Sequence, residues 1–170
     1  MSEKVAATYL EDMRQQVRGL KTLADRALSQ VKEEEFPVEI DVESNSITIL
    51  MKHVSGNMTT LWTRPLAPAE EWPPRHRDLE FTLTDEDNRE AVTARWNEAW
   101  GALFETLDGL KAGDLLGAMT IRGKDSTLME VLNGQYRHYA MHVGQIVFLA
   151  KHFRATDWES LSVPKKRARR

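Results

Sequence analysis

Apolar residues recur at alternating intervals of three and four along the first thirty residues. This stripe contains Leu10, Met13, Val17, Leu20, Ala24, Ala27 and Val31. Such spacing places the apolar side chains on one face of an α-helix and leaves polar residues on the other face. Because proline cannot continue a helix, Pro37 marks the end of the pattern. We therefore predict an amphipathic helix over residues 3–31, followed by a connector over residues 36–45.

Three further segments show helical spacing of apolar residues, and they cover residues 46–64, 85–110 and 126–154. The first of these ends before Pro65. Thr84 is a good N-cap for the second, because its hydroxyl can accept a bond from a free backbone N–H group. Thr127 and Glu130 have the spacing of a capping box, which predicts the start of the third.

The connection between the second and third predicted helices is long. It covers residues 65–84 and contains four prolines. A simple antiparallel turn needs fewer residues, whereas a crossover between parallel helices uses that length. We therefore predict an all-α fold, a four-helix bundle with up-down-down-up topology. Within the later connection, residues 119–122 can form a short extended piece.

The composition indicates one soluble domain over residues 1–164. The chain has 170 residues and a net charge of −3, and residues 165–170 carry five positive charges, which leaves residues 1–164 at −8. An acidic body repels a phosphate backbone, so nucleic-acid binding is not expected. No apolar run approaches the roughly 20 residues of a membrane helix, and no signal peptide is visible. We expect a cytoplasmic protein with a solvated basic tail.

The chain contains no cysteine and five histidines. Disulfides, zinc–thiolate sites, iron–sulfur clusters and cysteine nucleophiles are therefore excluded. Any metal site must use histidine, aspartate or glutamate.

Three of the histidines fall on predicted core faces. His138 and His142 are four residues apart, so they project from one face of the last helix, inside the edge of its apolar stripe. His53 interrupts the apolar face of the second helix in the same way. Buried imidazoles cost free energy unless they are hydrogen-bonded or bound to a metal. We predict that the three histidines converge, with hydrogen-bonded core histidines as the alternative.

Three imidazoles leave one position of a tetrahedral ion open, which is the catalytic arrangement. Zinc, nickel and iron all suit nitrogen ligands. Three amides near the histidines, Asn57, Gln135 and Gln145, are candidates to orient the ligands or to bind substrate. No catalytic residue can be assigned. His76 and His152 are expected at the surface.

Several short segments resemble the DinB-like superfamily of bacterial metalloenzymes, which includes the YfiT-like proteins, and most closely a branch catalogued as a domain of unknown function. They cover residues 43–47, 52–58, 120–123, 138–147 and 158–164. The order of His53 followed by His138 and His142 is the most specific feature.

The resemblance implies an up-down-down-up bundle, usually a homodimer, with a divalent metal bound by His53, His138 and His142. Characterised members of the superfamily that the chain resembles include thiol-dependent S-transferases and a mycothiol-dependent isomerase. We therefore expect a metal-dependent hydrolase or thiol-transferase that acts on a small molecule. A non-catalytic helical dimer that binds a small ligand, or a bundle with a structural metal, remains the alternative. Gly134 and Gly144 suggest close helix approach, within the bundle or at a dimer seam.

Overall fold

The computed structural model describes the chain except for residues 1, 64–66, 68–70, 122 and 164–170. It is mostly helical, as predicted. The helices are α1 (Glu3–Leu28), α2 (Ile47–Trp62), the short α3 (Arg77–Glu80), α4 (Arg89–Gly109) and α5 (Leu128–Arg154). Short 3-10 helices cover Glu33–Glu35, Ala112–Leu116 and Ala155–Asp157. The predicted basic tail, residues 165–170, lies outside the described residues.

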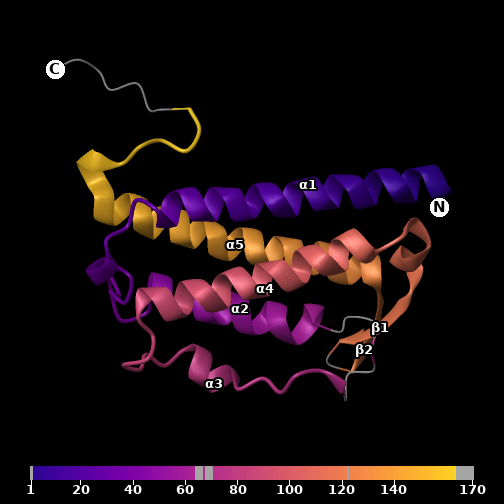
Figure 1. Cartoon of the computed structure of the whole chain (residues 1–170), viewed down its shortest axis with the longest axis horizontal. Coiled ribbons are helices and arrows are strands. Elements are labelled where there is room, and N and C mark those ends of the chain that lie inside the picture. Colours follow the sequence, from indigo (N-terminus) through magenta and orange to yellow (C-terminus); the bar gives the residue numbers. More distant parts are fainter. Residues whose placement is uncertain (1, 64–66, 68–70, 122, 164–170) are drawn as a thin grey trace.

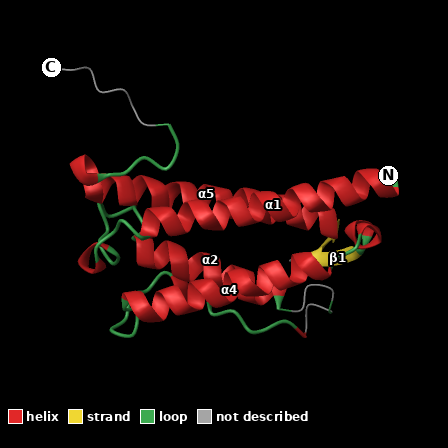
Figure 2. Cartoon of the chain, turned by 45° about the horizontal axis from the view of Figure 1, so that its top comes forward, coloured by secondary structure: helices red, strands yellow, loops and turns green. Residues whose placement is uncertain are grey.

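The four long helices lie alongside one another (Figure 1). α1 packs against α5, α2 packs against α4, and contacts between α1 and α4 and between α2 and α5 join the two pairs. The sequence colours show that α1 and α5 run in one direction along the long axis, whereas α2 and α4 run in the other. The turned view shows the same two pairs (Figure 2). α2 and α4 are therefore parallel neighbours, and the long connection between them returns the chain to the end where α2 began.

Local signals at the helix ends explain where most helices start. Ser46 accepts a hydrogen bond from the backbone N–H of Ile49 at the start of α2. The predicted capping box of α5 is confirmed, since Thr127 and Glu130 each bond to the other's backbone. The first helix ends at Leu28, three residues before the predicted end, although Val31 is still buried.

The predicted start of α4 was wrong. The helix begins at Arg89 with Asn88 as its N-cap, not at Asp85 after Thr84. The physical reason is that Asp87 accepts hydrogen bonds from both the N–H and the hydroxyl of Thr84. These bonds hold residues 84–87 in a turn, so the first helical N–H groups are capped by Asn88 instead.

Residues 111–127 form more strand than predicted. β1 (Ala118–Ile121) pairs with β2 (Lys124–Thr127) as an antiparallel hairpin, with Ala118 opposite Thr127 and Ile121 opposite Lys124. Gly123 in the turn has a φ of 74°, which glycine adopts without strain. The hairpin leads directly into α5.

The core is a single apolar cluster between the helices, and its largest fully buried side chains include Trp62, Trp96, Trp100 and Tyr139. A Cβ at Gly134 or Gly144 would meet nothing within 4 Å. Close helix approach within the chain is therefore not the reason for these glycines. Among the described residues, none of the helices combines the length and the apolar character that a bilayer span requires.

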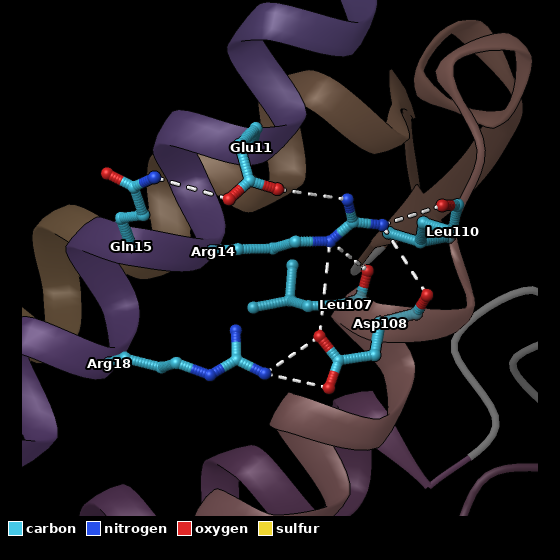
Figure 3. Close-up of polar contacts among 7 residues, drawn as sticks. All are labelled: Glu11, Arg14, Gln15, Arg18, Leu107, Asp108 and Leu110. Atoms are coloured by element: carbon cyan, nitrogen blue, oxygen red, sulfur yellow. Dashed lines mark hydrogen bonds and ion pairs between the residues drawn. The ribbon is translucent and has the colours of Figure 1, made fainter.

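A polar cluster joins the middle of α1 to the end of α4 (Figure 3). Arg14 donates hydrogen bonds from Nε to the Leu107 carbonyl at 3.0 Å and from Nη2 to the Leu110 carbonyl at 2.9 Å. One turn later, Arg18 Nη2 donates to both carboxylate oxygens of Asp108, at 2.8 and 2.7 Å. The last carbonyls of a helix lack partners within it. Arg14 therefore caps α4 from a neighbouring helix.

Candidate metal centre

The contact between α2 and α5 brings together the three histidines that the sequence placed on core faces. His53 comes from α2, and His138 and His142 come from α5, one turn apart. The Nε2 atom of His138 lies 3.1 Å from His53 Nε2 and 3.0 Å from His142 Nε2. His53 is 7% exposed and His142 is 8% exposed, whereas His138 is half-buried.

The spacing of these nitrogens fits a metal ion. One ligand atom from each histidine can be chosen so that all three lie within 4.8 Å of one another. Zinc–nitrogen bonds of about 2.0–2.1 Å in a tetrahedral site place neighbouring nitrogens about 3.3 Å apart. The two short Nε2 separations are close to that value, so the three-histidine group can hold a metal ion.

The outer ring nitrogens of two histidines are held by oxygen acceptors. His53 Nδ1 donates to Glu80 Oε2 at 3.0 Å, and His142 Nδ1 donates to Gln145 Oε1 at 2.8 Å. A neutral imidazole that carries its proton on Nδ1 has a lone pair on Nε2. Both lone pairs therefore face the centre of the group. This is the arrangement in which an outer partner sets the tautomer of a metal-binding histidine.

Hydrogen bonds among the three histidines cannot satisfy the Nε2 lone pairs of His53 and His142 at the same time. An N–H at His138 Nε2 has one proton, so it can form a good hydrogen bond to His53 or to His142 but not to both. A cation at the centre would accept electron density from all three Nε2 atoms. The donor chemistry of the group is therefore compatible with a metal ion at its centre.

Burial also suits His142 to metal binding. Desolvation lowers the pKa of His142, the nearby His53 lowers it further, and the hydrogen bond that His142 donates to Gln145 opposes these effects only in part. The imidazole is therefore neutral down to a lower pH than an exposed histidine, and a neutral imidazole is the form that binds a metal.

Glu80, in the short helix α3, is a member of the site that the sequence analysis missed. Its carboxylate is buried and receives hydrogen bonds from Arg75, Nε to Oε1 at 2.6 Å and Nη2 to Oε2 at 2.8 Å. Burial alone would raise the pKa of Glu80, but the hydrogen bonds from Arg75 and His53 outweigh it and the pKa is lowered. Glu80 therefore stays ionised while it accepts the His53 proton.

Gly56 makes room for this carboxylate. It lies in α2, three residues after His53, and a Cβ there would overlap Glu80 Oε1. A glycine in the middle of a helix costs stability relative to alanine, so its presence here has a local use. A glycine inside a predicted helix, one turn from His53, is a sequence signal that could have indicated a close neighbour there.

A second buried hydrogen-bond chain fixes Asn57. Trp62 Nε1 donates to the Tyr139 hydroxyl at 2.8 Å, and this hydroxyl donates to Asn57 Oδ1 at 2.8 Å. Burial raises the pKa of Tyr139, which keeps the hydroxyl protonated and able to donate. The relay was not predicted from the sequence, because Tyr139 lies beside the ligand positions and reads as an ordinary core residue.

The three candidate amides have different surroundings. Gln145 contacts His142, whereas Asn57 and Gln135 line a cavity of about 430 Å³ that also touches His138. His76, beside Arg75, and His152, near the end of α5, are both exposed and lie outside the histidine group.

Comparison with known proteins identifies a family. Neither the search of curated proteins nor the search of solved structures found a match. One family model matches residues 4–167, which is nearly the whole chain and includes all the residues of the histidine group. The chain therefore belongs to the family described as "Protein of unknown function (DUF1572)".

Proposed function

We propose that this protein is a metal-dependent enzyme whose divalent ion is bound by His53, His138 and His142. A divalent ion held by three imidazoles keeps a coordination position open and lowers the pKa of a water or thiol bound there. The reaction class we propose is hydrolysis or transfer to a low-molecular-weight thiol. The observation that carries this proposal is the convergence of the three Nε2 atoms, with His138 Nε2 3.1 Å from that of His53 and 3.0 Å from that of His142.

The chain's own residues prepare the site for that ion. Glu80 and Gln145 hold the Nδ1 protons of His53 and His142, so that each Nε2 stays free of a proton. Arg75 compensates the charge of Glu80, and the buried packing of α2 against α5 limits movement of the rings. Zinc or nickel is the metal we propose, with iron as a further candidate, because all three bind imidazole.

We also propose that the four long helices are the up-down-down-up bundle of the DinB-like superfamily. The shared direction of α2 and α4, and the long connection between them, support this assignment. The alternative is a non-catalytic helical protein that binds a small ligand or keeps a structural metal.

Metal content tests the proposed centre. Purified wild-type protein is expected to bind one equivalent of zinc or nickel, measured by elemental analysis after dialysis. A double variant, His138→Ala with His142→Ala, should lose the metal because a single imidazole remains. His152→Ala, in the same helix but outside the group, is the matched control and should keep full occupancy. Full occupancy in the double variant would overturn the assignment.

A homodimer is the oligomeric state we propose. Met141 and Phe148 are 54% and 63% exposed on α5, and Gly144 lies between them on the helix with open space above its Cα. Apolar side chains on either side of a glycine allow a second helix to approach closely. This exposed strip is defined as Met141, Gly144 and Phe148.

A further inference from the structure

A cavity lies beside His138, one of the three proposed metal ligands. Its volume is about 430 Å³, which is in the range of small-molecule sites. The described residues that line it are Asn57, Thr60, Leu61, Trp72, Arg75, Ile121, Gln135 and His138. Leu61, Trp72 and Ile121 supply apolar and aromatic surface, whereas Asn57, Gln135 and Arg75 supply amides and a guanidinium.

The orientation of the Asn57 amide is fixed by its partners. The Tyr139 hydroxyl accepts a hydrogen bond from Trp62 Nε1, so its own O–H donates to Asn57 Oδ1. The other end of the amide, Nδ2, is therefore directed away from Tyr139. Because Asn57 is 6% exposed and lines the cavity, this nitrogen is the polar group that it offers there.

Gln135 also offers an amide N–H₂ group to the cavity. Its Oε1 is fully buried and has no hydrogen-bond partner among the described residues. The oxygen is thus turned inward, which leaves Nε2 as the end of the amide that a molecule in the cavity can reach. Two amide N–H₂ groups, from different helices, are consequently offered to the same space.

The charged residues at the cavity also favour an anionic ligand. Arg75 lines it, and the described lining residues include no carboxylate. The carboxylate that Arg75 contacts, that of Glu80, already accepts hydrogen bonds from Arg75 and His53. A group bound in this cavity therefore meets the amides of Asn57 and Gln135 and the guanidinium of Arg75, whose charge is balanced in part by Glu80.

We propose that this cavity binds a small organic molecule through a carboxylate, with its apolar part against Trp72, Leu61 and Ile121. Asn57 Nδ2, Gln135 Nε2 and the Arg75 guanidinium would donate to the carboxylate oxygens. Hydrogen bonds to an ionised acceptor are about twice as strong as those between neutral groups, which favours the acid over its amide. This inference deepens the proposed function and rests on it for the position of the reacting end.

Two probes of nearly equal shape test the proposal: phenylacetate and phenylacetamide. Each is titrated into zinc-loaded protein and into metal-free protein, and binding is followed by isothermal titration calorimetry. Phenylacetate is expected to bind at least tenfold more tightly than phenylacetamide. Equal affinity, or a preference for the amide, would overturn the proposal.

Asn57→Asp is the sharpest variant, since it keeps the oxygen that accepts from Tyr139 and replaces only the Nδ2 group by an oxygen. It should weaken phenylacetate binding at least tenfold and leave phenylacetamide binding nearly unchanged. Gln135→Glu likewise replaces an amide N–H₂ group by an oxygen, here on α5. It tests carboxylate binding if Asn57→Asp fails to fold. Unchanged phenylacetate affinity in a folded variant would show that the acid binds elsewhere, for example to the metal alone.

The two proposals can fail separately. If the wild-type protein binds no metal, the proposed function fails, and the metal-free titrations still decide whether the cavity prefers a carboxylate. If metal binds with the expected stoichiometry but the probes show no preference, only the cavity assignment fails.

Discussion

A single missing side chain, at Gly56, lets a carboxylate reach His53. Glu80 would overlap a Cβ at this position, and Glu80 is the acceptor for the His53 Nδ1 proton. The histidines could be predicted from their spacing and their apolar neighbours. Glu80 and Arg75 could not, because they lie in a proline-rich connection whose path no periodicity specifies.

Gly56→Ala should separate stability from metal binding. Alanine favours a helix over glycine by about 0.5–1 kcal/mol, but here the methyl group must displace Glu80 from His53. Loss of an outer partner of a metal-binding histidine costs about 10–100-fold in affinity, so zinc affinity should fall by that factor. Competition with a chelator measures it.

Gly101→Ala is the matched control, because Gly101 lies within α4 and a Cβ there meets nothing within 4 Å. It should stabilise the protein by a similar increment and leave zinc affinity unchanged. An equal zinc affinity in both variants would contradict the role given to Glu80.

At the scale of elements, the helices could be predicted from apolar periodicity, but their ends depended on side-chain hydrogen bonds. Asp87 shows why the start of α4 was misplaced. Its carboxylate accepts from Thr84, from Lys52 Nζ at 2.6 Å and from Arg95 Nη2 at 2.7 Å. Lys52 comes from α2 and Arg95 from further along α4, so periodicity did not reveal these two partners.

Asp87 should make the stability of the protein depend on pH in acid. Although burial opposes it, the hydrogen bonds from Lys52 and Arg95 lower the pKa of Asp87 from 3.8 to about 2. A lowered pKa stabilises the fold above about pH 4, and this contribution is lost as the pH falls toward 2. Relative to Asp87→Asn, the wild type should be more stable by about 1–2 kcal/mol at pH 7. Urea denaturation should show the gap closing between pH 4 and pH 2, and a constant gap would contradict this account.

The cap that α1 provides for α4 makes a second prediction at this scale. Arg14→Met removes hydrogen bonds to the carbonyls of Leu107 and Leu110 and should cost about 1–3 kcal/mol of unfolding free energy. Arg18→Met is the control, because the Arg18–Asp108 pair is about half exposed and such pairs contribute less than about 1 kcal/mol. Thermal denaturation of both variants measures the difference. Equal losses of unfolding free energy in both variants would show that the hydrogen bonds from Arg14 to the α4 carbonyls add little stability.

The whole molecule combines a predictable helical frame with a connection that the sequence left open. Four amphipathic segments and a long crossover indicated parallel neighbours, and α2 and α4 do run in the same direction. Periodicity did not indicate that α3 would pack against α2 and bring Glu80, with its partner Arg75, to the site. A chain segment without regular spacing is placed by contacts that form only in the folded state.

The exposed strip on α5 is the surface through which we propose that the protein forms a homodimer. Phe148→Glu places a charge where an apolar side chain is 63% exposed, so it should convert a dimer to a monomer with little effect on the fold. Val5→Glu, at a 55% exposed position on α1, is the matched control and should remain dimeric. Sedimentation velocity distinguishes the two. A wild-type monomer, or a dimeric Phe148→Glu variant, would contradict the proposed interface.

The central claim is that three imidazoles hold one divalent ion and leave a position open. X-ray absorption at the zinc edge of the zinc-loaded protein tests it most directly, because it counts imidazole ligands and measures their distances. We predict three imidazole nitrogens at about 2.0–2.1 Å together with one light, non-imidazole ligand from solvent. A fourth protein imidazole, fewer than three, or a zinc spectrum unaltered in the His53→Ala variant would contradict the account.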